Sequence, residues 1–204
     1  MDATAEPDAM SRTQARALSQ RNRILEAARL CFIEHGFHAA SMANIAEAAG
    51  MSAGLIYRYF DSKNAIILAI IERQLQDSRE GIAALQAGTV MAELFGEVFA
   101  RWTGGDETLI NPALLLEMSA LATRDAQIAE ALAESDRVTR AEFGEWLKGS
   151  AGARGRPPLG DDEARRRAFL VQCIFEGLAV RAAREPALDP GFVAESLRPL
   201  ADRL

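Results

Sequence analysis

Four side chains suited to binding a phosphate backbone lie within seven residues of one another: Tyr57, Arg58, Tyr59 and Lys63. They include both tyrosines of the protein. Hydroxyl and ammonium groups donate hydrogen bonds to phosphates, and an arginine can donate two parallel bonds to a guanine. Exposed aromatic side chains placed between basic ones need a reason, and binding to DNA supplies one. The grouping therefore indicates a nucleic-acid partner.

Two short predicted helices would position this group. Ser41 suits the N-cap of a helix over 42–49, and Ser52 suits the N-cap of a helix over 53–60. Gly50 stands where a left-handed residue is expected to end the first helix. Two short helices across a tight turn form a helix-turn-helix, whose second helix presents its first residues to the major groove. Considered alone, the helix pair also fits a plain helical hairpin with surface tyrosines.

The charge of the chain is distributed unevenly along its length. The total is −6, of which residues 1–10 contribute −3, residues 11–63 contribute +3 and residues 64–204 contribute −6. A basic segment followed by an acidic one favours a polyanionic partner for the first, although an excess of +3 is small enough to arise by chance.

The run from Arg23 to Ile71 resembles the DNA-binding domain of the tetracycline-repressor (TetR) family of bacterial transcriptional regulators. This resemblance implies an all-α fold with an N-terminal three-helix helix-turn-helix domain and a larger helical domain for ligand binding and dimerisation. It also implies a protein without catalytic activity. The residues that carry the resemblance are Ile24–Ala28, Phe32, Gly36–Phe37, Ile45–Gly50, Ser52, Gly54, Tyr57–Phe60 and Ser62–Lys63.

Carried over position by position, the resemblance assigns roles to individual residues. Tyr57, Tyr59 and Lys63 correspond to contacts with the DNA backbone, and Ser41 caps a helix near a phosphate. Direct reading of bases is expected to be sparse, because Ala43 replaces a basic residue of some relatives and Ala53 offers no hydrogen bond. DNA shape is then expected to carry part of the specificity. The full expected set of DNA-binding residues is Ser41, Ser52, Ala53, Gly54, Tyr57, Arg58, Tyr59 and Lys63, with Ala53, Gly54 and Arg58 facing the bases.

The rest of the chain is also expected to be helical. We expect a disordered tail over 1–10, the DNA-binding domain over 11–63, a connecting helix over 64–86, and a ligand-binding and dimerisation domain over 87–204. Within the first domain, a helix is predicted over 21–35 and Gly36 ends it. The capping-box spacing of residues 11–14 also fits an earlier start of this helix, frayed up to residue 19. Further helices are predicted over 89–102, 112–122, 125–148, 161–184 and 192–204, with a loop over 149–160.

Residues 169–180 are apolar on nearly every side of a helix, interrupted only by Gln172 and Glu176 among the larger side chains. Such a helix is buried all round, either as the central core helix of a monomer or between the core and a second subunit. The resemblance favours a homodimer, in which this helix and the helix over 192–204 form a four-helix bundle with their mates. A two-fold dimer would bind a palindromic operator.

Aromatic and sulfur-containing side chains of the second domain are expected to line an apolar cavity. Its occupant would be a small apolar or amphipathic effector that releases the protein from DNA, which would make the chain a ligand-responsive transcriptional repressor. Each of these residues taken alone also fits an ordinary core position. The set comprises Phe95, Phe99, Trp102, Met118, Phe143, Trp146, Phe169 and Cys173. Cys31 and Cys173 are both expected to be buried and unreactive.

Other classes of function find little support in the sequence. No serine–histidine–aspartate set is evident, and His35 and His38 lie on either side of Gly36, so neither catalysis nor a metal site is expected. No cofactor is expected either. The first ten residues lack the basic charge of a signal peptide and no apolar run reaches the ~20 residues of a membrane span, so we expect a cytoplasmic protein. The alternative is a helical adaptor or enzyme without DNA affinity.

Overall fold

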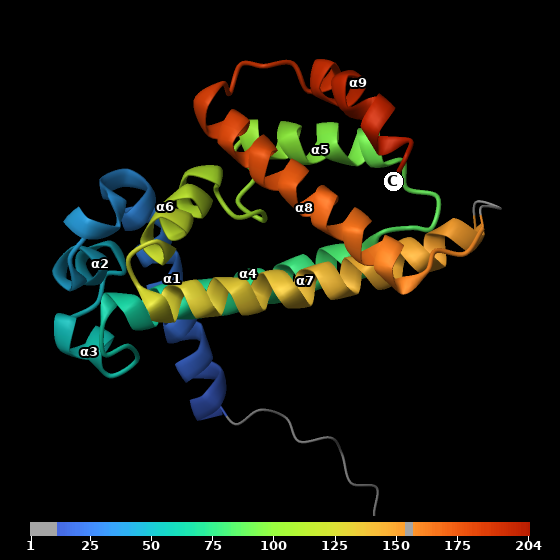
Figure 1. Cartoon of the computed structure of the whole chain (residues 1–204). Coiled ribbons are helices and arrows are strands. Elements are labelled where there is room, and N and C mark those ends of the chain that lie inside the picture. Colours follow the sequence, from blue (N-terminus) through green and yellow to red (C-terminus); the bar gives the residue numbers. More distant parts are fainter. Residues whose placement is uncertain (1–11, 154–156) are drawn as a thin grey trace, which may run out of the picture. The chain divides into compact units, whose positions relative to one another are not determined.

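The computed structural model describes residues 12–153 and 157–204 (Figure 1). All regular secondary structure in these two stretches is helical, which confirms the predicted all-α class. The chain divides into two compact units, one ending at Ile66 and the other running from Ile67 to Leu204. The division falls inside one helix, α4. The tail predicted over 1–10 lies outside the described residues.

The first unit contains α1 (Arg12–Ala39), α2 (Met42–Ala48), α3 (Ala53–Tyr57) and the first turn of α4 (Lys63–Ala84). Gly36 interrupts α1 with a left-handed backbone (φ 72°), so the glycine predicted to end the first helix does break its regular geometry. The helix begins at Arg12, which agrees with the earlier of the two predicted starts. The fully buried core of this unit is made by Ile24, Phe32, Ile45, Ile56 and Ile66.

Serine side chains begin the short helices, as predicted. The Ser41 hydroxyl accepts the Asn44 backbone N–H at 3.1 Å, and the Ser52 hydroxyl accepts the Leu55 backbone N–H at 3.3 Å. The second helix, predicted to reach residue 60, ends at Tyr57 instead. Its hydrogen bonds tighten there to a three-residue spacing, with Arg58 N–H bonding to Leu55 and Tyr59 N–H to Ile56. This tighter turn brings the chain round to Phe60, which is buried.

The second unit contains the remainder of α4 and five further helices: α5 (Met91–Thr103), α6 (Pro112–Ala122), α7 (Ala126–Ala153), α8 (Asp161–Arg184) and α9 (Pro190–Ala201). The bounds of α8 are those predicted. In contrast, α7 continues past the predicted end at 148 because Ser150 and Ala151 are buried and extend its packed face. Pro190 opens α9 two residues early, since Asp189 caps the helix through the Phe192 N–H at 2.7 Å.

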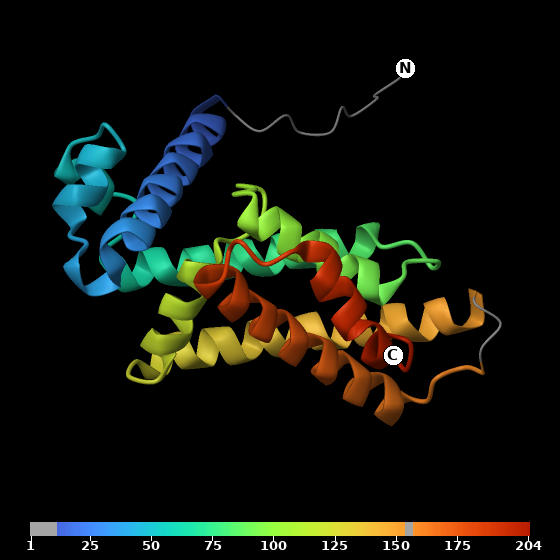
Figure 2. The ribbon, with the colours of Figure 1, turned by 90° about the horizontal axis from the view of Figure 1, so that it is seen from above.

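Within the second unit, α5 lies alongside α9, and the first part of α8 lies beside the end of α7 (Figures 1 and 2). The side chains between these helices form one apolar core built around Phe95, Phe99, Phe143 and Val171. None of the helices in the described stretches is long and apolar enough to cross a membrane.

Candidate nucleic-acid interface

One side of α3 is open to solvent while the other anchors the helix. Ile56 is fully buried, whereas Ala53, Gly54, Tyr57 and Arg58 are exposed. Tyr57 keeps 52% of its surface accessible, a large fraction for an aromatic residue. The structure therefore brings four of the eight expected DNA-binding residues together on the open side of the predicted recognition helix. Tyr59, one step further along, is half-buried.

Small residues at the start of α3 leave its backbone accessible. A Cβ built on Gly54 would meet nothing within 4 Å among the described residues, and Ala53 adds only a methyl group. A base pair or phosphate could therefore approach the main chain here without a side chain in the way. Ser52, the N-cap, is exposed at the same end of the helix.

The start of α2 is held by a reciprocal cap. The Asn44 N–H bonds to the Ser41 hydroxyl, the Ser41 N–H donates to the Asn44 side-chain oxygen at 2.9 Å, and the hydroxyl also donates to that oxygen. Ser41 is exposed, so the cap lies at the surface. The three-residue spacing of Ser41 and Asn44 is the sequence signal of this cap, with asparagine in place of the usual glutamate or glutamine.

Two arginines of α1 reach the helix-turn-helix, and neither was predicted from the sequence. The Arg21 guanidinium lies 5.2 Å from the centre of the Phe60 ring, a cation–π contact that ties α1 to the residues after α3. Arg23 stands over the turn: a Cβ built on Gly50 would lie 2.7 Å from its Nη2. Gly50 itself has φ 59°, the left-handed backbone expected from the sequence.

Lys63 is placed differently from the expected phosphate contact. Its ammonium donates to the carbonyls of Phe37 at 2.6 Å, His38 at 3.3 Å and Ala40 at 2.6 Å. It also lies 4.6 Å from the centre of the Phe37 ring. Burial lowers the pKa of this ammonium below its ordinary value. In the structure, the partly buried lysine is thus hydrogen-bonded to carbonyls of the protein itself.

The expected effector-binding residues fall into two groups. Phe95, Phe99 and Phe143 are buried in the core of the second unit, with Trp102 and Trp146 packed against it. Met118 is fully buried as well. In contrast, Phe169 keeps 54% of its surface exposed and Cys173 is exposed too. These two residues lie on the outer side of α8, so the expected interior position is wrong for both in the single chain, and so is the expected burial of Cys173.

The two tryptophans of the core differ in how their indole N–H groups are used. The Trp146 N–H donates to the Leu85 carbonyl at 3.2 Å. The Trp102 Nε1 is buried, yet no acceptor among the described residues meets it. A buried donor without a partner is unusual and destabilises a fold by about 1–3 kcal/mol.

Part of the exposed surface of α8 is an apolar row, which is flanked by exposed charged residues such as Arg165, Arg166 and Glu176. Phe169, Cys173 and Gly177 follow one another at four-residue spacing and are all exposed, and Leu170 beside them keeps 44% of its surface. On α9, Phe192 keeps 60%. The helix predicted to be buried on every side is therefore uncovered on one side in the single chain.

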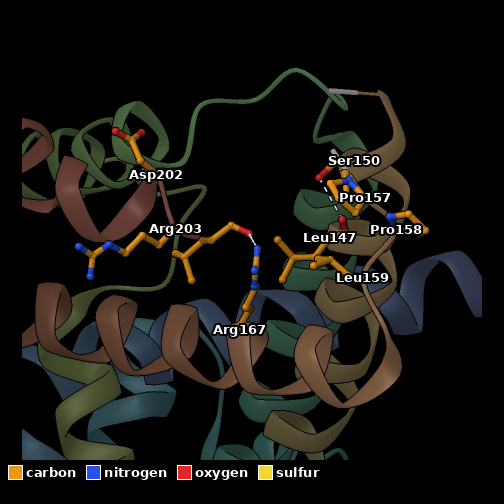
Figure 3. A pocket seen from close by; sticks show the side chains of 10 residues that line it. Leu147, Ser150, Pro157, Pro158, Leu159, Arg167, Asp202 and Arg203 are labelled. Carbon is orange, nitrogen blue, oxygen red and sulfur yellow. Dashed lines mark hydrogen bonds between the residues drawn. The ribbon is translucent and has the colours of Figure 1, made fainter. Parts of the chain in front are cut away.

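A pocket of about 310 Å³ opens near the N-terminal end of α8 (Figure 3). Leu147 and Leu159 form its apolar wall, and Arg167 reaches across it to donate to the Leu204 carbonyl. The Arg167 guanidinium also pairs with Glu163 at 2.7 Å, so it already bonds to two groups of the protein itself. None of the eight residues expected to bind an effector lines this pocket.

Comparison with known proteins places the chain among transcriptional regulators. Residues 24–70 match the family model described as "Bacterial regulatory proteins, tetR family". The HTH-type transcriptional regulator UidR of Escherichia coli strain K12 is 32% identical over 193 residues, which span 93% of this chain and 94% of that protein. The similarity thus extends well beyond the helix-turn-helix.

Solved structures share the fold. Salmonella enterica GusR is 30% identical with a TM-score of 0.73, and the match covers 90% of this chain and 94% of that one. FadR from Bacillus subtilis, solved in complex with stearoyl-CoA, is 20% identical with a TM-score of 0.60 over 88% of this chain and 96% of that one. At this lower identity the likeness concerns the fold alone.

Proposed function

The chain belongs to the TetR family of bacterial regulatory proteins, and we propose that it is a ligand-responsive repressor that binds a palindromic operator as a homodimer. The observation that carries this proposal is the open side of α3, where small residues expose the backbone beside Tyr57 and Arg58. A major groove about 12 Å wide admits such a helix. We place the protein in the cytoplasm, where it meets chromosomal DNA.

The proposed contacts divide into those that position the protein and those that read sequence. Tyr57 and Tyr59 donate to phosphates, as do the exposed ends of α2 and α3 at Ser41 and Ser52. Arg58 donates to a guanine, since it is the arginine on the open side of α3. Ala53 and Gly54 let the backbone approach the base edges, and DNA shape contributes the remaining specificity.

Dimerisation is proposed through the uncovered side of α8 together with α9. A row of apolar residues that includes Phe169 and Cys173 would be covered by the same row of a second copy, because a two-fold interface uses one surface twice. Gly177 in this row lets two helices approach closely. The paired recognition helices would then meet half-sites about one helical turn, ~34–36 Å, apart.

The effector is proposed to be amphipathic, with an apolar body and at least one hydrogen-bond acceptor. The aromatic core of the second unit suits the apolar body, and the Trp102 N–H, which meets no acceptor in the part of the chain that the structure describes, suits the acceptor. The ligand named for the Bacillus subtilis FadR structure, stearoyl-CoA, has both features. Release from DNA requires that the effector bind one conformation better than the other, and coupling of about 1–3 kcal/mol gives a switch of ~5–150-fold.

A gel shift tests the core of the proposal. The probe is the DNA directly upstream of the gene that encodes the protein, at two salt concentrations, with a scrambled duplex of equal length as control. We expect a dimer to bind the upstream DNA in preference to the control, with weaker binding at higher salt. Equal affinity for the two duplexes would contradict operator binding.

A second experiment addresses the effector. Mass spectrometry of the purified protein identifies a bound small molecule, and calorimetry then measures its affinity with and without the upstream DNA. Reciprocal coupling requires the DNA to weaken binding of an inducer by the factor by which the inducer weakens DNA binding. A ligand that binds equally well in both titrations is no inducer.

A further inference from the structure

The Lys63 ammonium uses its full hydrogen-bonding capacity inside the first unit. A lysine has three N–H donors, and three carbonyls receive them, those of Phe37, His38 and Ala40. The Phe37 ring covers the ammonium from a further direction, 4.6 Å away. To bind a phosphate, Lys63 would have to give up at least one of these bonds.

The position of the three carbonyls explains why they need such a donor. They lie in the last turn of α1, which ends at Ala39, and just beyond it, where carbonyls have no helical N–H four residues on to pair with. A cation at the end of a helix also meets the negative end of the helix dipole. Lys63 therefore caps the C-terminal end of α1, although it lies 23–26 residues further along the chain.

Lysine is rare in this protein, so its use here is informative. Only two of the 23 basic residues are lysines, Lys63 and Lys148. Lys148, which is likewise partly buried, pairs with Glu145 at 2.7 Å and Asp161 at 2.6 Å. An arginine could serve in that kind of pairing, but its flat guanidinium cannot direct three donors to carbonyls that converge on one point.

We propose that Lys63 is a positioning residue of the DNA-binding unit, which fixes the start of α4 to the junction between α1 and α2. Ala40, whose carbonyl it binds, directly precedes Ser41, the cap of α2. Any displacement of the first turn of α4 is passed through these bonds to α2. Lys63 thus sets the orientation of the helix-turn-helix without touching DNA. This inference rests on the proposed function in one respect, namely that the helix-turn-helix binds DNA.

Two substitutions separate positioning from phosphate contact. Lys63→Met removes the charge and Lys63→Arg keeps it, while Lys148→Met serves as the control for loss of a lysine elsewhere. Each variant is assayed on a duplex enriched from a random pool by the wild-type protein and on a random-sequence duplex. The salt dependence of binding is measured on both duplexes at a temperature well below unfolding.

For a positioning residue, both Lys63 variants weaken binding to the enriched duplex by about tenfold or more, because methionine offers the three carbonyls no donor and arginine cannot direct three donors to them. Their affinity for the random duplex and their salt slope stay at the wild-type values, as in Lys148→Met. A phosphate contact gives the opposite pattern: the salt slope of Lys63→Met falls by about one ion per subunit and Lys63→Arg behaves like the wild type. That pattern would overturn the proposal.

A spectroscopic test uses the unmodified protein and needs no operator. With lysines labelled by ¹⁵N, the two ammonium groups give two side-chain signals. We expect the Lys63 signal to show slow proton exchange and to stay unshifted when a random-sequence duplex is added. Rapid exchange in the free protein, or a shift on adding DNA, would overturn the inference. Because no sequence preference enters this measurement, it distinguishes a failure of the inference from a failure of the proposed operator binding.

Discussion

Gly96 of α5 faces Ala194 of α9 so closely that a Cβ built on Gly96 would lie 2.9 Å from the Ala194 Cβ. It would lie equally close to the Pro190 carbonyl oxygen, at 2.9 Å. Gly96 and Ala194 belong to helices of the second unit that lie alongside each other (Figure 1). The absence of a side chain at Gly96 is therefore what allows α5 and α9 to approach.

Gly96→Ala is expected to destabilise the protein by about 1–3 kcal/mol, because the added methyl group meets backbone that cannot move aside easily. Gly144→Ala is the matched control. Gly144 lies in α7, where a new Cβ would come no nearer than 3.8 Å to the Ala164 carbonyl. There the substitution should stabilise the helix by about 0.5–1 kcal/mol. Urea unfolding of the variants at equal protein concentration measures both effects, and equal shifts would contradict the close approach.

Arg58→Ala is expected to weaken operator binding by about 1–3 kcal/mol and to relax the preference at one base pair per half-site. The reason is that Arg58 is the exposed arginine beside the open side of α3. Selection of binding sites from a random pool measures the preference position by position. Arg124→Ala, which removes an exposed arginine of the second unit, is the control. An unchanged consensus in Arg58→Ala would remove this residue from base recognition.

Tyr57→Phe deletes only the hydroxyl of the most exposed aromatic side chain of the first unit. We expect affinity to fall by about 0.5–1.5 kcal/mol for every DNA sequence alike, since a phosphate carries no sequence information. The salt slope should remain unchanged because the hydroxyl is neutral. Fluorescence anisotropy with operator and random duplexes provides the comparison. A loss confined to the operator would instead place the tyrosine against a base.

Gly177→Glu is expected to convert the proposed dimer to a monomer, because it puts a charge into the apolar row of α8. In the single chain, the new side chain would have open space. Gly81→Glu is the control, since Gly81 is likewise a helical, exposed glycine with open space around it. Sedimentation velocity at micromolar concentration should show a dimer for the control and a monomer for Gly177→Glu. The buried Ala179 of the same helix is unsuited to this test, as a charge there would disturb the subunit itself.

Low pH is expected to destabilise the fold at the loop after α5, because it protonates the Asp106 carboxylate. Hydrogen bonds from the Thr108 hydroxyl and the Arg101 guanidinium, both at 2.7 Å, and from the Thr108 N–H lower the pKa of Asp106 to about 2. A carboxylate whose pKa is depressed by folding stabilises the fold above its ordinary pKa of 3.8, and that contribution is lost as the pH falls from 3.8 to about 2.

The test compares Asp106→Asn with the wild type in urea unfolding at several pH values. The variant should be less stable near pH 6, and the difference should shrink steadily as the pH falls from about 4 to about 2, where the wild-type carboxylate becomes protonated in the folded protein. Glu107→Gln, which alters a neighbour outside these bonds, is the control. A constant difference at all pH values would show that the hydrogen bonds, rather than the charge, matter.

Local signals in the sequence determined the helices and the helix-turn-helix. Ser41 and Ser52 each accept a backbone N–H at the start of a helix, and Gly36 and Gly50 take the left-handed backbone that their positions indicated. These features could be predicted because a cap or a left-handed turn involves residues only two to four positions apart. The interpretation of the exposed side of α3 followed from the same local pattern.

Only the tertiary structure decided which partners the longer-range side chains find. It placed Phe169 and Cys173 on the exposed side of α8. When a helix is apolar on nearly every side, its sequence does not indicate which side packs against the core. It gave Trp146 an acceptor at Leu85, 61 residues away, and left Trp102 without one among the described residues.

The same reason accounts for Lys63. Read as sequence, it is a basic residue beside two tyrosines, which indicates a phosphate contact. In the structure its ammonium donates to carbonyls 23–26 residues earlier in the chain. This is because the packing of α1 against the short helices places the C-terminal end of α1 next to Lys63, the first residue of α4. A hydrogen bond of that span depends on how helices pack in three dimensions, and no spacing within one helix encodes it.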